Sequence, residues 1–294
     1  MFACQVFLHF RQKKSFFVDT SQPQCYTLKR MYYVKIVMHQ AFTQTYITQE
    51  GFNMQIHVFE NAAQVGQAAA TLIAAQVISK PDSVLGLATG STPIPTYQEL
   101  ARLNKAGVVD FSRVRSYNLD EYCNLPEDHE QSYHSFMKEN LFKHINIDIN
   151  NTHVPNGNAA DPAAEGANYD AAIAAAGGID IQILGIGRNG HIGFNEPGDH
   201  FVYGCHVVEL TQSTIEANRR FFESEADVPR KAISLGVGSI VNARKILLLA
   251  TGADKADAIR ASVYGDIDPQ CQASILRGHP DVIFLLDKAA ASKL

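Results

Sequence analysis

The 294-residue sequence has few cysteines, no long apolar segment and no overall excess of positive charge. Its five cysteines are scattered, odd in number and never paired at metal-ligand spacing, which disfavours a disulfide scaffold and a metal site. We therefore expect free thiols in a reducing cytosol, and hence a cytoplasmic protein. No apolar run approaches the roughly 20 residues of a membrane-spanning helix, so we expect no membrane association.

Positive charge is concentrated at the start of the chain. Six of the 25 Lys and Arg residues, but only two of the 30 Asp and Glu residues, lie in residues 1–53. The remainder therefore has a net charge of −9, and an acidic body of that kind repels nucleic acid. If the protein binds a phosphorylated ligand, the attraction must come from local groups.

Residues 1–53 also differ from the rest in pattern. They are rich in Phe, Tyr and Gln and show no sustained hydrophobic period, whereas alternation typical of a strand begins at Met54. We interpret residues 1–53 as a poorly ordered extension or as sequence upstream of the true start. A targeting peptide is the alternative, although the charged-then-apolar order of a secretory signal is missing. Residues 54–294 contain no Pro- or Ser-rich linker, which predicts one domain.

Short apolar runs alternate with helical patterns throughout residues 54–294. Continuous apolar strands separated by helices predict an α/β fold with three αβα layers, in which a mostly parallel, Rossmann-like sheet has helices on both faces. The expected strands are 54–59, 83–88, 113–118, 179–184, 206–209, 232–235, 245–250 and 282–286. The expected helices are 62–79, 93–104, 131–144, 162–176, 214–222 and 255–264.

Three loops follow strands at the ends where open parallel sheets bind ligands. Residues 86–93 read Gly-Leu-Ala-Thr-Gly-Ser-Thr-Pro, so that Gly90 and the N–H groups of a following helix could cradle a phosphate. Alone this signal is weak, because many glycine turns before helices are plain connections. The Lys-Ser/Thr ending of a nucleotide-binding P-loop is also missing.

The second loop carries adjacent carboxylates, Asp120 and Glu121. Both are unlikely to face one small site, so we expect one to act as a base while the other caps a helix or meets solvent. Asp120 is the better candidate for the base, although a capping role would be favoured if this loop stood alone.

The third loop, residues 185–197, has the strongest pattern: four glycines are interleaved with Asn189, His191, Asn195 and Glu196. A histidine titrates near neutrality, so His191 can take and return a proton. Glu196 can hold one imidazole nitrogen and leave the other for a substrate. A lone loop histidine is usually structural, but this combination favours catalysis.

Together the ordered motifs resemble those of glucosamine-6-phosphate deaminases, over residues 54–287. The matching segments are Asn-Leu-Asp-Glu-Tyr at 118–122, Leu-Pro at 125–126, His129 through Tyr133, Gly-His-Ile-Gly-Phe-Asn-Glu-Pro at 190–197, Ala-Asn-Arg-Arg-Phe-Phe at 217–222, Gly-Val-Gly at 236–238 and Gly-Ala-Asp-Lys-Ala at 252–256.

The resemblance implies conversion of glucosamine 6-phosphate to fructose 6-phosphate and ammonia, in amino-sugar catabolism, without metal or organic cofactor. It implies that His191, assisted by Glu196, opens the sugar ring. It further implies that Asp120 moves a proton from the second sugar carbon to the first, after which water releases ammonia from an imine.

The same resemblance assigns the phosphate of the substrate to the loop after the second strand, with two cations supplied from later in the chain. Arg220 offers a fork of donors, and Lys255 offers a compact charge. The residues implied for this site are Thr89, Gly90, Ser91, Thr92, Arg220 and Lys255.

Two departures from the family pattern matter. Some members have aspartate where this chain has Asn189, which cannot titrate and can only orient its neighbours. Allosterically activated members have basic residues shortly after the Glu-Pro pair, whereas residues 198–208 contain neither Arg nor Lys. We therefore expect no activation by N-acetylglucosamine 6-phosphate, and a monomer or small homo-oligomer.

Two alternatives remain open. A 6-phosphogluconolactonase has a similar fold and loops, but such enzymes tend to read Ser-Leu-Phe-Pro where this chain has Phe-Asn-Glu-Pro, so Glu196 discriminates. A sugar-phosphate sensor attached to a DNA-binding module is less favoured, because residues 1–53 show no helix-turn-helix pattern.

Overall fold

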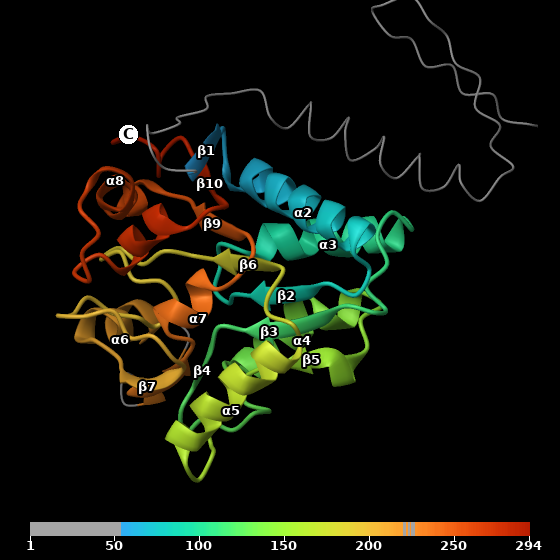
Figure 1. Ribbon diagram of the computed structural model, residues 1–294, viewed down its shortest axis with the longest axis horizontal. Coiled ribbons are helices and arrows are strands. Elements are labelled where there is room, and N and C mark those ends of the chain that lie inside the picture. Colours follow the sequence, from blue (N-terminus) through green and yellow to red (C-terminus); the bar gives the residue numbers. More distant parts are fainter. Residues whose placement is uncertain (1–53, 220–221, 223, 225–226) are drawn as a thin grey trace, which may run out of the picture.

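A seven-stranded parallel sheet forms the centre of the protein, seen in the computed structural model that describes residues 54–219, 222, 224 and 227–294 (Figure 1). The strand order is β1-β10-β9-β6-β2-β3-β5, and every pairing within this sheet is parallel. The expectations for residues 1–53 and for Arg220 lie outside the described residues. The strands are β1 (Met54–Phe59), β2 (Val84–Leu87), β3 (Arg115–Asn118), β5 (Thr152–His153), β6 (Ile181–Leu184), β9 (Ile246–Ala250) and β10 (Val282–Asp287).

Helices lie on both faces of this sheet, as the sequence predicts for an αβα fold (Figure 1). The α-helices are α2 (Ala62–Ser79), α3 (Ile94–Lys105), α4 (Tyr133–Asn140), α5 (Pro162–Ala175), α6 (Gln212–Asn218), α7 (Val237–Val241) and α8 (Ala256–Tyr264). Local sequence explains several of their starts. Asn61, Ser132 and Asp161 each accept a backbone N–H of the helix that follows, which satisfies a donor that the first helical turn leaves without a partner.

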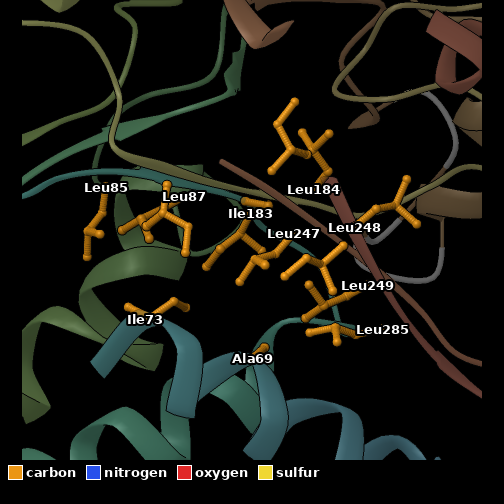
Figure 2. Close-up of a cluster of buried hydrophobic side chains, with 14 of the residues drawn as sticks. Ala69, Ile73, Leu85, Leu87, Ile183, Leu184, Leu247, Leu248, Leu249 and Leu285 are labelled. Carbon is orange, nitrogen blue, oxygen red and sulfur yellow. The ribbon is translucent and has the colours of Figure 1, made fainter. Parts of the chain in front are cut away.

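The hydrophobic core occupies the space between the sheet and these helices. Strands β2, β6 and β9 are buried along their whole length, because helices cover both faces and neither set of side chains meets water. Figure 2 shows Ile183, Leu247 and Leu285 on the side of Ala69 and Ile73 of α2, with Leu184 directed to the opposite side. Because successive side chains of a strand point to opposite faces of the sheet, each strand contributes to the core on both sides.

A second, antiparallel sheet corrects one expectation. We expected residues 206–209 and 232–235 to join the parallel sheet, but they form a three-stranded sheet of order β4-β8-β7. Its strands are β4 (Asp120–Tyr122), β7 (His206–Glu209) and β8 (Lys231–Ser234). A four-residue run carries no information on strand direction, so its pairing depended on which neighbours tertiary packing supplied. The added sheet places Asp120 on a strand and not in a loop.

The order of the parallel strands reverses between β2 and β6. From β2 the chain proceeds outward to β3 and β5, then returns to β6 and continues in the other direction through β9 and β10. Ligands of open α/β sheets bind beyond the carboxyl ends of the strands at such a reversal. The loops after β2 and β6 flank this point, and the loops after β3 and β9 lie next to them.

Candidate active site

The candidate base, Asp120, lies at the start of β4, two residues after β3 ends. It pairs across the small sheet with Ser234 of β8, and it is only 6% exposed. Burial, with a smaller contribution from the like charge of Glu121, raises the pKa of Asp120 to about 8. A carboxyl group that titrates near neutrality is suited to taking up and releasing a proton.

Its neighbour Glu121 caps helix α4, which is one of the two roles that the sequence left open for the carboxylate that does not act as the base. Its carboxylate accepts the backbone N–H groups of Tyr133 and His134 at 2.9 and 3.1 Å, in the first turn of α4. His134 Nδ1 also lies 3.0 Å from Glu121 Oε2. A negative charge at a helix N-terminus is stabilising, so Glu121 holds α4 against β4 while Asp120 remains available for chemistry.

In residues 185–197, called the histidine loop below, the backbone approaches its neighbours closely at glycines. A Cβ at Gly187 would collide with the imidazole ring of His191, so the backbone can approach the ring only because that side chain is absent. Gly193 has a φ of +58°, and a Cβ built there would lie 3.7 Å from Asp120 Oδ2. The structure therefore brings the loop after β6 against Asp120, although the two are distant in sequence.

The candidate acid Glu196 is tied into this loop by several contacts. Its Oε2 accepts a hydrogen bond from Asn189 Nδ2 at 2.7 Å and lies 3.4 Å from His191 Nδ1. Its Oε1 accepts the hydroxyl of Thr214 at 2.5 Å. Burial opposes the charged form, but the contacts with His191, Thr214 and Asn189 outweigh it and lower the pKa of Glu196 to about 2.

Asn189 therefore orients its neighbours on both sides. While its amide donates to Glu196, its Oδ1 accepts the backbone N–H of His191 at 3.2 Å. This agrees with the expectation that a non-titrating residue here acts through hydrogen bonds. His191 Nδ1 is buried without a hydrogen bond among the described residues, and Glu196 is the carboxylate beside it.

The loop after β2 presents an exposed turn at the start of a long helix. Gly90 has a φ of +94° with open space around its Cα, and both Gly90 and Ser91 are exposed. Thr89 and Thr92 are half-buried, and α3 begins two residues later at Ile94. Backbone N–H groups at a helix N-terminus attract anions, so this loop can bind a phosphate.

Two tyrosines fix the base of that loop. The hydroxyl of Tyr97 donates to Ala88 O at 2.5 Å and accepts from Ala88 N at 3.2 Å, which joins α3 to the end of β2. The phenol of Tyr133, at the start of α4, lies near the side chains of Thr89 and Tyr122. Burial raises the pKa of both phenols, so they act as neutral hydrogen-bonding groups.

Lys255 follows β9 at the same edge of the sheet. It ends a short 3₁₀ turn, Ala253–Lys255, and precedes α8. Its ammonium lies 3.8 Å from Asp254, whose carboxylate also accepts a hydrogen bond from Arg188 at 2.8 Å. The structure thus places one of the two expected cations at the edge where the candidate site lies. The other, Arg220, is outside the described residues.

Thr214 is the contact that sequence reasoning missed. It lies on α6, four residues before the Asn218-Arg219 pair that the family resemblance includes, and its own residue type carried no signal. A threonine in a helix is common and its hydroxyl usually bonds within the helix, so only the fold reveals that this one reaches Glu196.

Comparison with known proteins now identifies the family. The sequence model described as glucosamine-6-phosphate isomerases/6-phosphogluconolactonase matches residues 59–284. The chain belongs to this family. The glucosamine-6-phosphate deaminase of Clostridioides difficile is 57% identical over 241 residues, which cover 82% of this chain and 97% of that protein. The one from Halothermothrix orenii is 55% identical, over 82% of this chain and all of its own length.

Solved structures agree with the family assignment. One described as a monomeric glucosamine-6-phosphate deaminase shares 43% identity and a TM-score of 0.79, covering 81% of this chain and 99% of that one. The 6-phosphogluconolactonase of Trypanosoma brucei has a TM-score of 0.62 at 22% identity, covering 83% of this chain and all of its own. At that identity the likeness shows the fold alone.

The described residues also show what they contain in the way of apolar helices, metal-binding groups and thiols. None of the helices in that part of the chain has the length and apolar character needed to span a bilayer. The same residues contain no group of three or more His, Cys, Asp or Glu side chains arranged to hold a metal ion. Cys123, Cys205 and Cys271 are free thiols, as expected for them.

Proposed function

We propose that this chain is a glucosamine-6-phosphate deaminase, which converts glucosamine 6-phosphate and water to fructose 6-phosphate and ammonia. The observation that carries the proposal is Glu196, buried and 3.4 Å from His191 Nδ1. This residue separates the deaminase pattern from that of the lactonases. The deaminases that share over half of their residues with this chain point to the same activity.

Ring opening is the task of His191 and Glu196. The anomeric hydroxyl must lose a proton and the ring oxygen must gain one as the bond between the first carbon and that oxygen breaks. An imidazole can do both in sequence. Glu196 remains ionised at neutral pH because its pKa is about 2, so it orients the ring and stabilises the imidazolium and is not itself the proton carrier.

Isomerisation is the task of Asp120. In the open chain it takes the proton from the second carbon while the aldehyde oxygen gains one, which gives an enolamine. It then delivers its proton to the first carbon, which gives an imine that water cleaves to release ammonia. With a pKa of about 8, Asp120 is mostly protonated in the empty site at neutral pH. A cationic amino group of the bound sugar would favour its ionised form, so the substrate would help to prepare its own base.

Phosphate binding falls to the loop at 89–92 and to two cations. The N–H groups before α3 supply directed donors, and Lys255 at the same sheet edge supplies a charge. Arg220 is proposed as the second cation on the family resemblance alone. Because the body of the chain is acidic, these local groups must provide the attraction for a phosphorylated sugar.

The deciding experiment measures two reactions with the purified protein. We expect ammonia release from glucosamine 6-phosphate, and no hydrolysis of 6-phosphogluconolactone above the uncatalysed rate. Asp120→Asn is the control, because it keeps the shape of the site and removes the base. Lactone hydrolysis without ammonia release would instead support a 6-phosphogluconolactonase, an enzyme class with the same fold.

We further propose that the enzyme is cytoplasmic, acts as a monomer or small homo-oligomer and lacks activation by N-acetylglucosamine 6-phosphate. Residues 198–208 offer neither Arg nor Lys for a second sugar phosphate. The rate should therefore depend hyperbolically on substrate concentration, with or without the acetylated sugar. Sigmoidal kinetics that this compound relieves would contradict the proposal, and sedimentation analysis would give the oligomeric state.

A further inference from the structure

Glu196 is held from two sides by elements that are far apart in the chain. Its Oε2 faces the histidine loop, where Asn189 donates at 2.7 Å and His191 lies at 3.4 Å. Its Oε1 faces the opposite way and accepts the hydroxyl of Thr214 at 2.5 Å, from helix α6. Hydrogen bonds to an ionised acceptor are the short, strong ones, and 2.5 Å is within their range.

The hydroxyl of Thr214 is turned away from its own helix. The usual partner of a helical threonine hydroxyl is a carbonyl three or four residues earlier, and Thr71 of α2 follows that rule with Gln67 O at 2.8 Å. Thr214, only 7% exposed, donates instead to a carboxylate 18 residues away in sequence. Thr211, the N-cap of α6, donates its hydroxyl to Thr214 Oγ1 at 3.1 Å.

These contacts form one directed chain. The hydroxyl of Thr211 donates to that of Thr214, which donates to Glu196, and Glu196 lies against the imidazole of His191. Each donor polarises the next, so the hydrogen bond to Glu196 at the end of the network is strengthened. His191 is the titratable group that contacts Glu196 in this network, and Asn189 and Thr214 are neutral.

We propose that Thr214 is a positioning residue for ring opening: its hydroxyl fixes the carboxylate of Glu196 in the orientation that holds His191. This inference rests on the deaminase function proposed above, and it extends the active site to helix α6. Without the hydroxyl, Oε1 would be a buried acceptor lacking its donor. The carboxylate could then turn away from His191 or take up a proton.

The test compares Thr214→Val with Thr214→Ser, using Thr71→Val as the matched control. Valine keeps the shape and removes the donor, whereas serine keeps the donor. In Thr214→Val we expect kcat to fall by about tenfold to a hundredfold with KM changed by less than about threefold, which corresponds to the loss of one hydrogen bond to a charged group. Thr214→Ser and Thr71→Val should stay within about twofold of the wild type, because neither changes the contact with Glu196.

A pH series separates positioning from a loss of packing. If the carboxylate of Glu196 loses its donor, its pKa rises, and the deficit of Thr214→Val in kcat/KM should grow as pH falls from 7.5 to about 5. Thermal unfolding of each variant shows whether it is folded at each pH. Should Thr214→Val not fold, Thr214→Ala with the same pH series takes its place.

The outcomes are distinct. Wild-type kcat and an unchanged pH profile in folded Thr214→Val would overturn the proposal, as would equal losses in Thr214→Val and Thr214→Ser. If the wild type released no ammonia from glucosamine 6-phosphate, the proposed function itself would fail. The role of Thr214 would then be judged from the Glu196 carboxyl resonance, whose titration should move to higher pH in Thr214→Val and stay in place if the hydroxyl is incidental.

Discussion

The two buried carboxylates of the candidate site have pKa values shifted in opposite directions. Asp120, on strand β4, has its pKa raised to about 8, whereas Glu196, in the loop after β6, has its pKa lowered to about 2. Burial disfavours the charged form of both. They differ because Glu196 accepts hydrogen bonds from Asn189 and Thr214 and lies 3.4 Å from the imidazole of His191, whereas Asp120 lies beside the like charge of Glu121.

This difference divides the chemistry between them. A carboxyl group that gains and loses its proton near neutrality can transfer protons, and a permanently ionised one can only orient and stabilise a cation. Opposite pKa shifts in one site therefore support our proposal that Asp120 transfers the proton on carbon and that Glu196 supports His191. The predictions that follow change one side of this comparison at a time.

The largest effect is expected for Asp120→Asn. Removing the base should lower kcat for ammonia release by about 10³-fold or more. Hydrogen exchange with solvent at the second carbon, followed by NMR, should be lost as well. Exchange that persists in this variant would remove Asp120 from its assigned role.

Asp120→Asn should also be more stable than the wild type, which distinguishes the loss of the base from a misfolded protein. The folded-state pKa of Asp120 lies above its unfolded value of 3.8, so the cost of ionising it is absent below about pH 4 and grows as pH rises towards 8. Asp120→Asn should therefore raise the free energy of unfolding by about 5 kcal/mol at pH 8 and by little at pH 4. Denaturant titrations at both pH values measure the difference.

Glu196→Gln should act in the opposite direction on stability. The pKa of Glu196 lies below its unfolded value of 4.5, so its ionised form stabilises the fold above that pH, and this contribution disappears as pH falls through about 2. We expect a loss of about 2 kcal/mol at pH 7 and a kcat lower by about a hundredfold. A variant as stable as the wild type at pH 7 would contradict the lowered pKa.

Glu121→Gln should shift the pH dependence of the reaction. Removing the like charge lowers the pKa of Asp120, so the rise of kcat/KM with pH should move to lower pH by roughly one unit. Stability should fall too, because the N–H groups of Tyr133 and His134 lose their charged acceptor. An unmoved pH profile would show that Glu121 has no influence on the base.

Asn189→Asp should have the smallest effect. A second carboxylate beside Glu196 raises the pKa of Glu196 and replaces a donor with an acceptor, so we expect kcat to be unchanged or lower by about threefold. Steady-state kinetics at pH 7.5 are sufficient to measure this. A greatly increased rate would show that an acid at this position takes part in ring opening, against the view that His191 and Glu196 carry it between them.

Much of this architecture could be predicted from the sequence. Six of the seven strands of the parallel sheet and the main helices follow from apolar runs and helical periods, with observed bounds within a few residues of the expected ones. The seventh strand, β5 (Thr152–His153), was not expected, because two residues are too short to show a pattern. The α/β fold and the family resemblance are both confirmed. The three loops were recognisable because each joins a buried strand to small, polar or ionisable residues, a pattern that the core does not require.

Other features depended on contacts that no local pattern contains. The antiparallel sheet of β4, β8 and β7 could not be foreseen, since short strands do not encode their partners. The capping role of Glu121 became visible only in the fold, because the first N–H groups of α4 donate to its carboxylate. Thr214 could not be identified at all, because the residue it contacts is distant in the chain.

What the sequence alone determined is the set of chemical groups and the strand ends from which they extend: Asp120, His191 and Glu196 beyond parallel strands, with a glycine turn before a helix. What only the tertiary structure decided is the environment of each group. A pKa depends on burial, on neighbouring charges and on hydrogen-bond donors, and these come from segments that meet only when the chain is folded. Two carboxylates thus have pKa values shifted in opposite directions, which is why we propose proton transfer for Asp120 and a fixed charge for Glu196.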